Sequence, residues 1–407
     1  MSGGTRILRP LPPPPLWPAP PTDEGQPRLD VRGMLPDELS SAMRGWGQPG
    51  YRGQQVFNAL HGQCVRGFQE MHVLPTTLRA LLQARAVGTG LVPEARQSDA
   101  TDGTVKYLFR LADGNTIETV LMRYRYGYSV CVSSQVGCRM GCTFCASTLG
   151  GLVRNLSAGE MAEQIDFING ELAAAARQGR PDERFPVPPA EHPDEGARFD
   201  RIARLVVMGM GEPLENLDEV VRFLRVAHEG GGAGIGFRHM TVSTSGLVPG
   251  IDRLAELDLP ITLAVSLHAP NDELRNRLVP LNRRHPLTEL LPACRRYAEA
   301  TGRRLTFEYV LIRGVNDLRE HARELGRLLR GLPCHVNLIP LNPVTERNLL
   351  PSTGEAVVRF RGLLRGAGIT TTTRRQLGTA IDAACGQLRR RREERSNAGR
   401  SDAGDLC

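Results

Sequence analysis

From residue 204 onward, short apolar segments alternate with longer amphipathic ones, and this alternation narrows the possible folds more than any other feature. The apolar segments are strand candidates, at 204–208, 239–243, 261–266, 305–312, 335–340 and 369–373. Helix candidates lie between them, for example at 218–228, 287–300 and 319–330. Strands that alternate with helices predict parallel βα units, in an open sheet or in a barrel. The side chains of a functional site are then expected on loops at the carboxyl ends of the strands.

The N-terminal quarter of the sequence predicts two regions. Residues 1–33 begin with a proline-rich stretch, which favours an extended chain, so we expect a disordered extension there. Residues 34–98 carry apolar side chains at helical spacing. They predict a small helical domain in which the helical pattern runs to about Gln97.

A second domain is expected over residues 99–388. Its first part alternates apolar and polar residues, which predicts strands at 105–110, 116–123 and 128–133, with a hairpin turn at 113–115. Residues 177–200 are rich in Pro, Asp and Glu, have no clear period, and predict an inserted surface loop. Residues 389–407 begin with four arginines and predict a disordered tail.

The charge of the chain is dominated by arginine. The net charge is +7, and Lys106 is the single lysine beside 50 arginines. Arginine suits phosphate recognition, but a GC-rich genome also encodes Arg where others encode Lys, and we favour that explanation for the ratio. The net positive charge still points weakly to nucleic acid. No run of about 18 apolar residues and no apolar leader is present, so we expect a cytoplasmic protein without a membrane span.

Cysteines cluster in one short stretch. Four of the nine lie between 131 and 145, and Cys138, Cys142 and Cys145 form C-x3-C-x2-C directly after a strand candidate. Three thiolates on one loop can hold a soft metal or a cluster, and on a four-iron cluster they leave one iron open. A structural zinc would need a fourth ligand from a distant residue, because no second cysteine or histidine pair follows. The spacing alone leaves zinc open.

The C-x3-C-x2-C motif is the signature of the radical S-adenosylmethionine (SAM) superfamily. The sequence on both sides of this motif resembles the RlmN/Cfr family of RNA adenine methyltransferases. The motifs that carry this resemblance are 133–138, 143–146, 209–213, 242–246, 266–271, 336–340 and 383–388. The resemblance spans about 35–388. It implies an α/β fold with a partial (βα)6 barrel, a helical N-terminal domain and an extra β-hairpin segment. It also implies a [4Fe–4S] cluster on Cys138, Cys142 and Cys145.

The same resemblance implies that the open iron is chelated by the amino and carboxylate groups of SAM. The SAM-binding residues that it implies are Gly211, Glu212, Ser243, Ser266, Leu267, His268 and Asn342. Most of these lie at or just past predicted strand ends, where polar groups can hold ribose and carboxylate. Taken by itself, the glycine motif at 209–212 is equally compatible with a plain strand-to-helix turn, and His268 with a hydrogen-bonded loop histidine.

Three catalytic residues are implied by the resemblance. Cys385 takes a methyl group from SAM and becomes S-methylcysteine, Cys131 resolves the RNA-bound intermediate through a transient disulfide with Cys385, and Glu118 is the proton acceptor. A cytoplasmic disulfide of this kind is catalytic. From the residues alone, Cys131 also fits a buried core position and Glu118 a solvated strand carboxylate. Strand alternation places Glu118 on the face opposite Ile117 and Thr119.

The reaction implied by the resemblance uses two SAM molecules per turnover. One methylates Cys385, and the other yields a radical that activates this methyl group for attack on an adenine ring carbon. The implied substrates are 23S rRNA near the peptidyl-transferase centre and the adenosine 3′ to the anticodon of some tRNAs, methylated at carbon 2 and gripped by the N-terminal domain 34–98. We further expect a monomer and an external electron donor such as flavodoxin or ferredoxin.

Two alternatives remain open. A Cfr-like enzyme would methylate carbon 8 and confer ribosomal antibiotic resistance, and its motifs are nearly the same. A zinc-stabilised RNA-binding protein would perform no catalysis and would bind zinc in place of iron.

Overall fold

The computed structural model describes residues 28–88, 90–178, 185, 194, 196–342, 347–375, 377–378 and 381. The proline-rich residues 1–27, most of the 177–200 loop, the tail 389–407 and Cys385 lie outside this described part. What the sequence predicts for them therefore stays a prediction.

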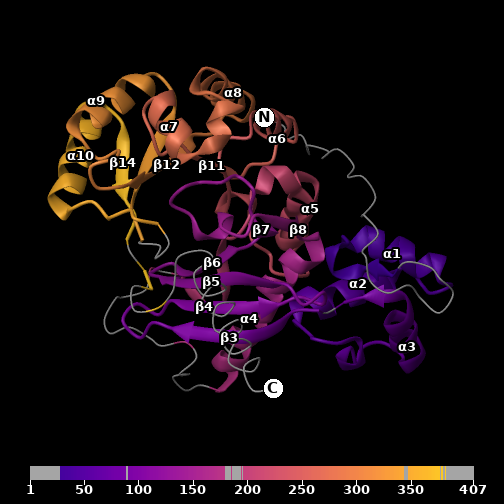
Figure 1. The fold of residues 1–407 in the computed structure, drawn as a ribbon. Helices are drawn as coiled ribbons and strands as arrows, with labels where there is room; N and C mark the ends of the chain where they lie inside the picture. Colours follow the sequence, from indigo (N-terminus) through magenta and orange to yellow (C-terminus); the bar gives the residue numbers. More distant parts are fainter. Residues whose placement is uncertain are drawn as a thin grey trace, which may run out of the picture.

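One ten-stranded sheet forms the centre of the molecule (Figure 1). Its strand order is β14-β13-β12-β11-β10-β9-β6-β5-β4-β3. Seven of these strands are parallel: β6 (Gly127–Val132), β9 (Arg198–Val207), β10 (Met240–Thr244), β11 (Thr262–Ser266), β12 (Leu305–Leu311), β13 (Cys334–Pro340) and β14 (Thr370–Thr373). The six strands predicted after residue 204 are all present in this parallel run.

Helices follow six of the parallel strands. They are α4 (Ala158–Gln178), α5 (Leu217–His228), α6 (Val248–Glu256), α7 (Asp272–Leu278), α8 (Leu287–Thr301), α9 (Arg319–Leu328) and α10 (Gly354–Gly366). The buried faces of the other helices and of the strands share one large apolar cluster, whereas Leu274 and Leu278 of α7 pack in a smaller cluster with the cysteine loop. Within the described residues, the outer strands β14 and β3 do not pair with each other, so the barrel stays open. Six βα units and a final strand confirm the predicted partial barrel.

Three antiparallel strands extend the sheet beyond β6. β5 (Thr116–Tyr124) pairs with β6, β4 (Val105–Arg110) with β5, and β3 (Val92–Ser98) with β4. The predicted hairpin is confirmed, with Gly114 at φ 84° in its turn. The prediction of helix up to Gln97 was wrong. β3 is an edge strand with little burial on either face and a register shift at Pro93, so it has no apolar alternation to recognise.

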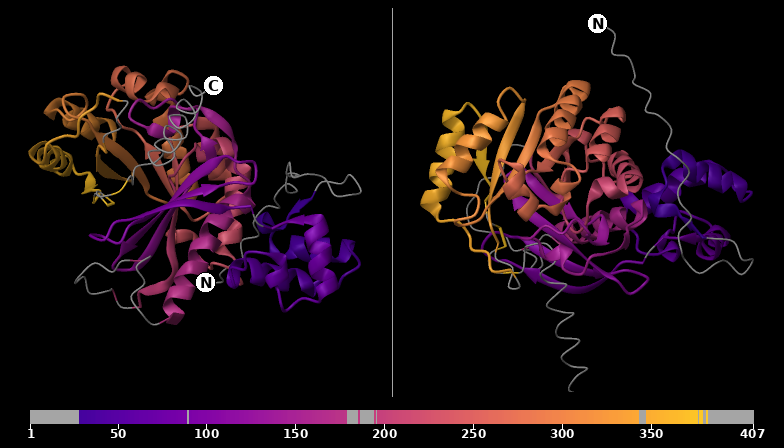
Figure 2. Two further views of the ribbon diagram at one scale, coloured as in Figure 1. Left: turned by 60° about the horizontal axis from the view of Figure 1, so that its bottom comes forward. Right: turned by 45° about the horizontal axis from the view of Figure 1, so that its top comes forward.

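The helices α1 (Pro36–Gly45), α2 (Tyr51–Phe57) and α3 (Thr76–Arg85) lie together beside the sheet (Figure 2). The prediction that residues 1–33 are disordered was wrong for the last few of them. Leu29–Asp30 forms a short strand and Val31–Gly33 a 3-10 turn. Arg32 is buried there, and its Nη1 donates to Asp166 Oδ2 on α4 at 2.5 Å. The sequence did not predict this buried ion pair, because nothing near Arg32 distinguishes it from the other arginines.

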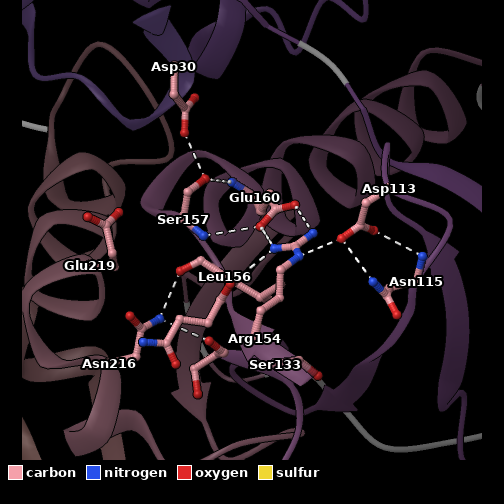
Figure 3. A network of polar contacts seen from close by, with 12 residues as sticks. Asp30, Asp113, Asn115, Ser133, Arg154, Leu156, Ser157, Glu160, Asn216 and Glu219 are labelled. Atoms are coloured by element: carbon pink, nitrogen blue, oxygen red, sulfur yellow. Dashed lines mark hydrogen bonds and ion pairs between the residues drawn. The ribbon is translucent and has the colours of Figure 1, made fainter. Parts of the chain in front are cut away.

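A network of polar contacts ties the N-terminal residues to the core (Figure 3). Arg154, in β8 (Leu152–Asn155), donates to both carboxylate oxygens of Glu160 at 2.8 and 2.9 Å, and its Nε donates to Asp113. The hydroxyl of Ser157 donates to Asp30 Oδ2 at 2.7 Å and accepts from the Glu160 N–H. The hairpin turn, the start of α4 and the N-terminal segment are thereby joined. In the part of the chain that the structure describes, no helix is both long and apolar enough to cross a membrane.

Candidate active site

A cavity of about 320 Å³ opens at the carboxyl ends of the parallel strands. The predicted site residues that line it are Cys131, Cys138, Cys142, Cys145, Gly211, Glu212, Ser243, Ser266, His268 and Asn342. Two described residues of the predicted set, Glu118 and Leu267, are absent from its lining. Leu267 is fully buried in the core, and only its backbone lies near the strand ends, where its N–H donates to Glu308 O. The structure thus gathers residues from positions 131 to 342 around one space.

The cysteine loop follows β6 and is fixed by backbone hydrogen bonds. Gly137 has φ 76°, and a Cβ there would lie 2.0 Å from the Gly151 carbonyl oxygen, so glycine is required. The Cys138 N–H donates to this same carbonyl at 2.9 Å. Thr148 Oγ1 donates to the carbonyl of Cys142 and to that of Cys145. These hydrogen bonds fix the course of the loop.

The three loop thiols suit an iron–sulfur cluster. Burial raises the pKa of Cys138 to about 12 and that of Cys142 well above its usual range, and the neighbouring Cys145 raises both further. Thiolates gathered in so apolar a place need a compensating cation, which a cluster supplies. Within the described residues, no group of three or more His, Cys, Asp or Glu side chains is arranged to hold a single metal ion.

Close packing against residues 132–135 accounts for the two glycines of the 209–212 loop. A Cβ on Gly209 would lie 2.6 Å from Val132 O, and one on Gly211, where φ is 117°, would lie 2.7 Å from Ser134 Oγ. The loop after β9 therefore fits directly against the entry to the cysteine loop. The Met210 N–H also donates to Ser133 Oγ at 3.0 Å.

Glu212 links two neighbouring strand ends. Its Oε2 accepts from both the N–H and the hydroxyl of Ser245 at 2.7 Å, and its Oε1 accepts from the Leu214 N–H at 3.1 Å. Burial raises the pKa of this carboxyl, and the hydrogen bonds from Ser245 oppose that rise. Its carboxylate thus joins the loop after β9 to the loop after β10 at the cavity wall.

His268 is buried and strained. It has φ 60°, and its Nδ1 accepts from the Val310 N–H at 3.0 Å. Burial, with a contribution from Arg275, lowers the pKa of His268 to about 3, so the imidazole is neutral near pH 7. Its ring meets that of Phe144 edge-on at 4.7 Å between centroids. The neutral His268 ring, which contacts the cysteine loop through Phe144, is thus part of the cavity wall.

Arg275 is a residue that sequence reasoning missed. It is fully buried, and its guanidinium donates to Ser245 O at 2.6 Å, to Leu267 O at 3.1 Å and to Ser266 O at 3.1 Å. It therefore holds the ends of β10 and β11, which present the predicted SAM-binding residues. One arginine among 50 carries no sequence signal of such a role.

Glu118 lies on the cavity-facing side of β5. Val120, two residues on, lines the cavity and pairs across the sheet with Cys131. Thr119 points the other way and donates to Gln164 on α4 at 2.8 Å, as strand alternation predicts. The carboxylate of Glu118 is buried and forms an ion pair with Lys106 at 2.8 Å. Glu118 is thus next to the cavity wall, and the expectation of a solvated carboxylate does not hold.

Comparison with known proteins assigns this site to a family. Residues 132–326 match the Radical SAM superfamily. The chain is 50% identical to a "Probable dual-specificity RNA methyltransferase RlmN" of Symbiobacterium thermophilum, covering 92% of this chain and 94% of that one. It is 47% identical to the protein of the same name in Staphylococcus aureus, covering 87% and 90%.

A solved structure agrees with these relatives. The crystal structure of a radical SAM methyltransferase from Sphaerobacter thermophilus superposes with a TM-score of 0.79 and 48% identity, covering 88% of this chain and 98% of that one. Members of this superfamily use a [4Fe–4S] cluster and SAM, and these are the cofactors of the present chain. The chain belongs to the RlmN family of radical SAM RNA methyltransferases.

Proposed function

We propose that this enzyme methylates carbon 2 of one adenosine in 23S rRNA and of the adenosine 3′ to the anticodon in some tRNAs. The observation that carries the proposal is the cavity itself, in which the three loop cysteines, Cys131 and the polar strand ends share one space. The "dual-specificity" in the relatives' name supports two RNA substrates, and the name RlmN favours carbon 2 over carbon 8.

In this proposal the cofactors supply the electron, the methyl groups and the radical that an unreactive ring carbon requires. Cys138, Cys142 and Cys145 would hold the cluster. Gly211, Glu212, Ser243, Ser266, Leu267, His268 and Asn342 would hold SAM. Arg275 keeps two of the strand ends in place. Val120, Met122 and Cys131 form an apolar part of the cavity wall, which would exclude water from the place where the methyl group is transferred.

Cys385 would carry the methyl group, and the chain leading toward it supports this role. Leu377 packs against the cluster of Val120, Met122 and Cys131. The Gly378 N–H donates to the buried Asp102 Oδ2 at 2.7 Å. Cys385 comes seven positions after Gly378, which is enough chain to reach the same cavity. Cys131 would then resolve the intermediate through a transient disulfide, with Glu118 as proton acceptor.

The partners follow from this reaction. The positive net charge and the helical domain 34–98 would contact RNA phosphates, while an unstacked adenine enters the cavity. An external donor such as flavodoxin or ferredoxin would reduce the cluster. We propose that the enzyme acts as a monomer in the cytoplasm.

The replacement Cys131→Ala tests this function. With resolution blocked, RNA should remain attached through Cys385, and peptide mapping should find a nucleotide mass on that residue. Cys294→Ala is the matched control, because Cys294 is fully buried on α8 and does not line the cavity. It should turn over normally and trap no RNA. Normal turnover by Cys131→Ala would contradict the mechanism.

A further inference from the structure

Glu308 is a buried carboxylate of the cavity wall to which the proposed reaction gives no role. It lies on β12, three residues before the strand ends at Leu311, and it is 5% exposed. Among the described residues that line the cavity, two are carboxylates, Glu212 and Glu308. Both oxygens of Glu212 already accept hydrogen bonds from the protein. Glu308 is therefore the carboxylate of this cavity that has room for a further partner.

The sheet fixes the direction of the hydrogen bonds at Glu308. Ser266, Glu308 and Asn337 pair in register on β11, β12 and β13, so their side chains point to the same face. Asn337 Nδ2 donates to Glu308 Oε2 at 2.9 Å. Asn337 Oδ1 accepts from the hydroxyl of Thr372 on β14 at 3.1 Å. Because Thr372 occupies the amide oxygen of Asn337, the amide nitrogen faces Glu308, and the carboxylate acts as an acceptor.

The other oxygen of Glu308 stays available to a ligand. In the described part of the chain, Asn337 is the hydrogen-bond partner of this carboxylate, and it engages Oε2 alone. Burial raises the pKa of Glu308, while the charge of Arg374, which also lines the cavity, and the hydrogen bond from Asn337 oppose that rise. When a ligand displaces water from the cavity, an oxygen left without a donor is costly. The ligand that fits beside Glu308 is therefore one that presents an N–H or O–H group there.

An adenine base presents such a donor. Its exocyclic amine at carbon 6 donates, whereas guanine carries an acceptor oxygen at the same place, which a carboxylate repels. Glu308 and Cys131 line the same cavity and both lie inside their strands. Four of the residues predicted to hold SAM instead follow the ends of their strands, namely Gly211, Glu212, His268 and Asn342. This placement favours the base that reacts near Cys131 as the partner of Glu308.

We propose that Glu308 recognises the target adenine of the RNA by accepting a hydrogen bond from its exocyclic amine. This inference rests on the proposed function, because it concerns the base that is methylated. It makes Glu308 a specificity-determining residue that selects adenine against guanine. SAM carries the same amine, and Ser266, which pairs with Glu308, belongs to the residues predicted to bind SAM. The experiment therefore includes a measurement for each of the two ligands.

The test compares two proteins on two RNAs. Anticodon stem-loop RNAs carry either adenosine or purine riboside at the target position, and purine riboside lacks the exocyclic amine. The quantity measured is kcat/KM for methylation, for wild type and for Glu308→Gln with their clusters loaded. In the variant, Asn337 donates to the new amide oxygen, so an amide N–H group faces the ligand and repels the amine.

The preference of wild type for adenosine over purine riboside should exceed that of Glu308→Gln by about tenfold or more. A difference in the intrinsic reactivity of the two bases is the same for both proteins and cancels in this comparison. If Glu308→Gln does not fold, Glu308→Met removes the buried charge, keeps a side chain of similar length, and should give the same result.

Glu324→Gln is the matched control. Glu324 lies on α9, accepts a hydrogen bond from Asn271 Nδ2 at 2.9 Å, and does not line the cavity. Its replacement exchanges the same groups in the same kind of hydrogen bond. It should leave the preference for adenosine within about twofold of the wild-type value.

Two binding measurements complete the test. The dissociation constant for radiolabelled SAM, from equilibrium dialysis, should stay within about twofold of wild type in Glu308→Gln. The dissociation constants of the two RNAs should show the same loss of preference in the variant as kcat/KM does.

An equal preference in wild type and Glu308→Gln would overturn the inference. About tenfold weaker binding of SAM with an unchanged preference would also overturn it, because Glu308 would then serve SAM. Absence of methylation by the wild-type enzyme would refute the proposed function, and the dissociation constants of the two RNAs would still decide whether Glu308 reads the amine.

Discussion

At the scale of single residues, buried charges carry much of the organisation of this molecule. Arg275 fastens two strand ends beneath the cavity, and Arg32 fastens the N-terminal segment to α4. Each burial costs solvation free energy that only several hydrogen bonds offset. Such residues are therefore poor candidates for neutral substitution, although nothing in the sequence distinguishes them from surface arginines.

Glu163 gives a pH-dependent test of this polar core. Both of its carboxylate oxygens lie 3.2 Å from the Gly90 N–H, and burial raises its pKa to about 7. Because the folded pKa exceeds the unfolded one, its contribution to stability is complete below about pH 4.5 and is lost as the pH rises through 7.

The measurement is the free energy of unfolding in urea from pH 5 to 8, for wild type and for Glu163→Gln. The wild-type value should fall relative to the variant by at most about 1.4 kcal/mol per pH unit. The difference should level off above pH 7. A pH-independent difference between the two proteins would show that Glu163 does not titrate in this range.

At the scale of elements, the site depends on loops that pack backbone against backbone. The loop after β9 meets the end of β6 so closely that a single methyl group at Gly209 would collide with Val132 O and Ser133 N. This contact sets the cysteine loop beside Glu212. The order of the cavity therefore comes from this close fit of two loops as well as from the hydrogen bonds of Glu212 and Arg275.

The variant Gly209→Ala should cost about 2 kcal/mol or more of stability, because backbone atoms must move to admit the methyl group. It should also lower the cluster content of the purified protein. Gly150→Ala is the control on the same loop system, since a Cβ there meets nothing within 4 Å. That replacement should change stability by no more than about 0.5 kcal/mol. Similar losses for both variants would argue against close packing as the reason for Gly209.

The strands of the parallel run were predictable because buried parallel strands are short and rich in apolar residues, as in Leu305–Leu311. β3 could not be predicted, because an exposed edge strand is not rich in apolar residues. The cysteine loop and the strand-end residues beside it could be predicted from the spacing of the motifs. The role of Arg275 could not be predicted, because it depends on the packing that brings distant segments together.

At the scale of the whole molecule, the partial barrel and its antiparallel extension share one continuous sheet. The parallel strands contribute the cluster loop and the polar strand ends, and β4 and β5 contribute Lys106 and Glu118. Cys131, on β6, lies where the two halves join. In the proposed reaction, the side that holds the cofactors and the side that resolves the intermediate would thus come from different parts of the sheet.

Metal content distinguishes this enzyme from a zinc-stabilised RNA-binding protein. After anaerobic purification the chain should contain about four iron and four sulfide per molecule and should cleave SAM when reduced. Replacing Cys142 by Ala should abolish both properties while leaving the fold intact by circular dichroism. One zinc per chain and no iron would contradict the assignment.

The central claim is tested most directly by the identity of the methylated nucleoside. Reduced enzyme, SAM and unmodified 23S rRNA or tRNA are incubated anaerobically, and the digested RNA is analysed by mass spectrometry against 2-methyladenosine and 8-methyladenosine standards. We predict 2-methyladenosine from both RNAs. A product of 8-methyladenosine, or no methyladenosine from an enzyme that cleaves SAM, would contradict it.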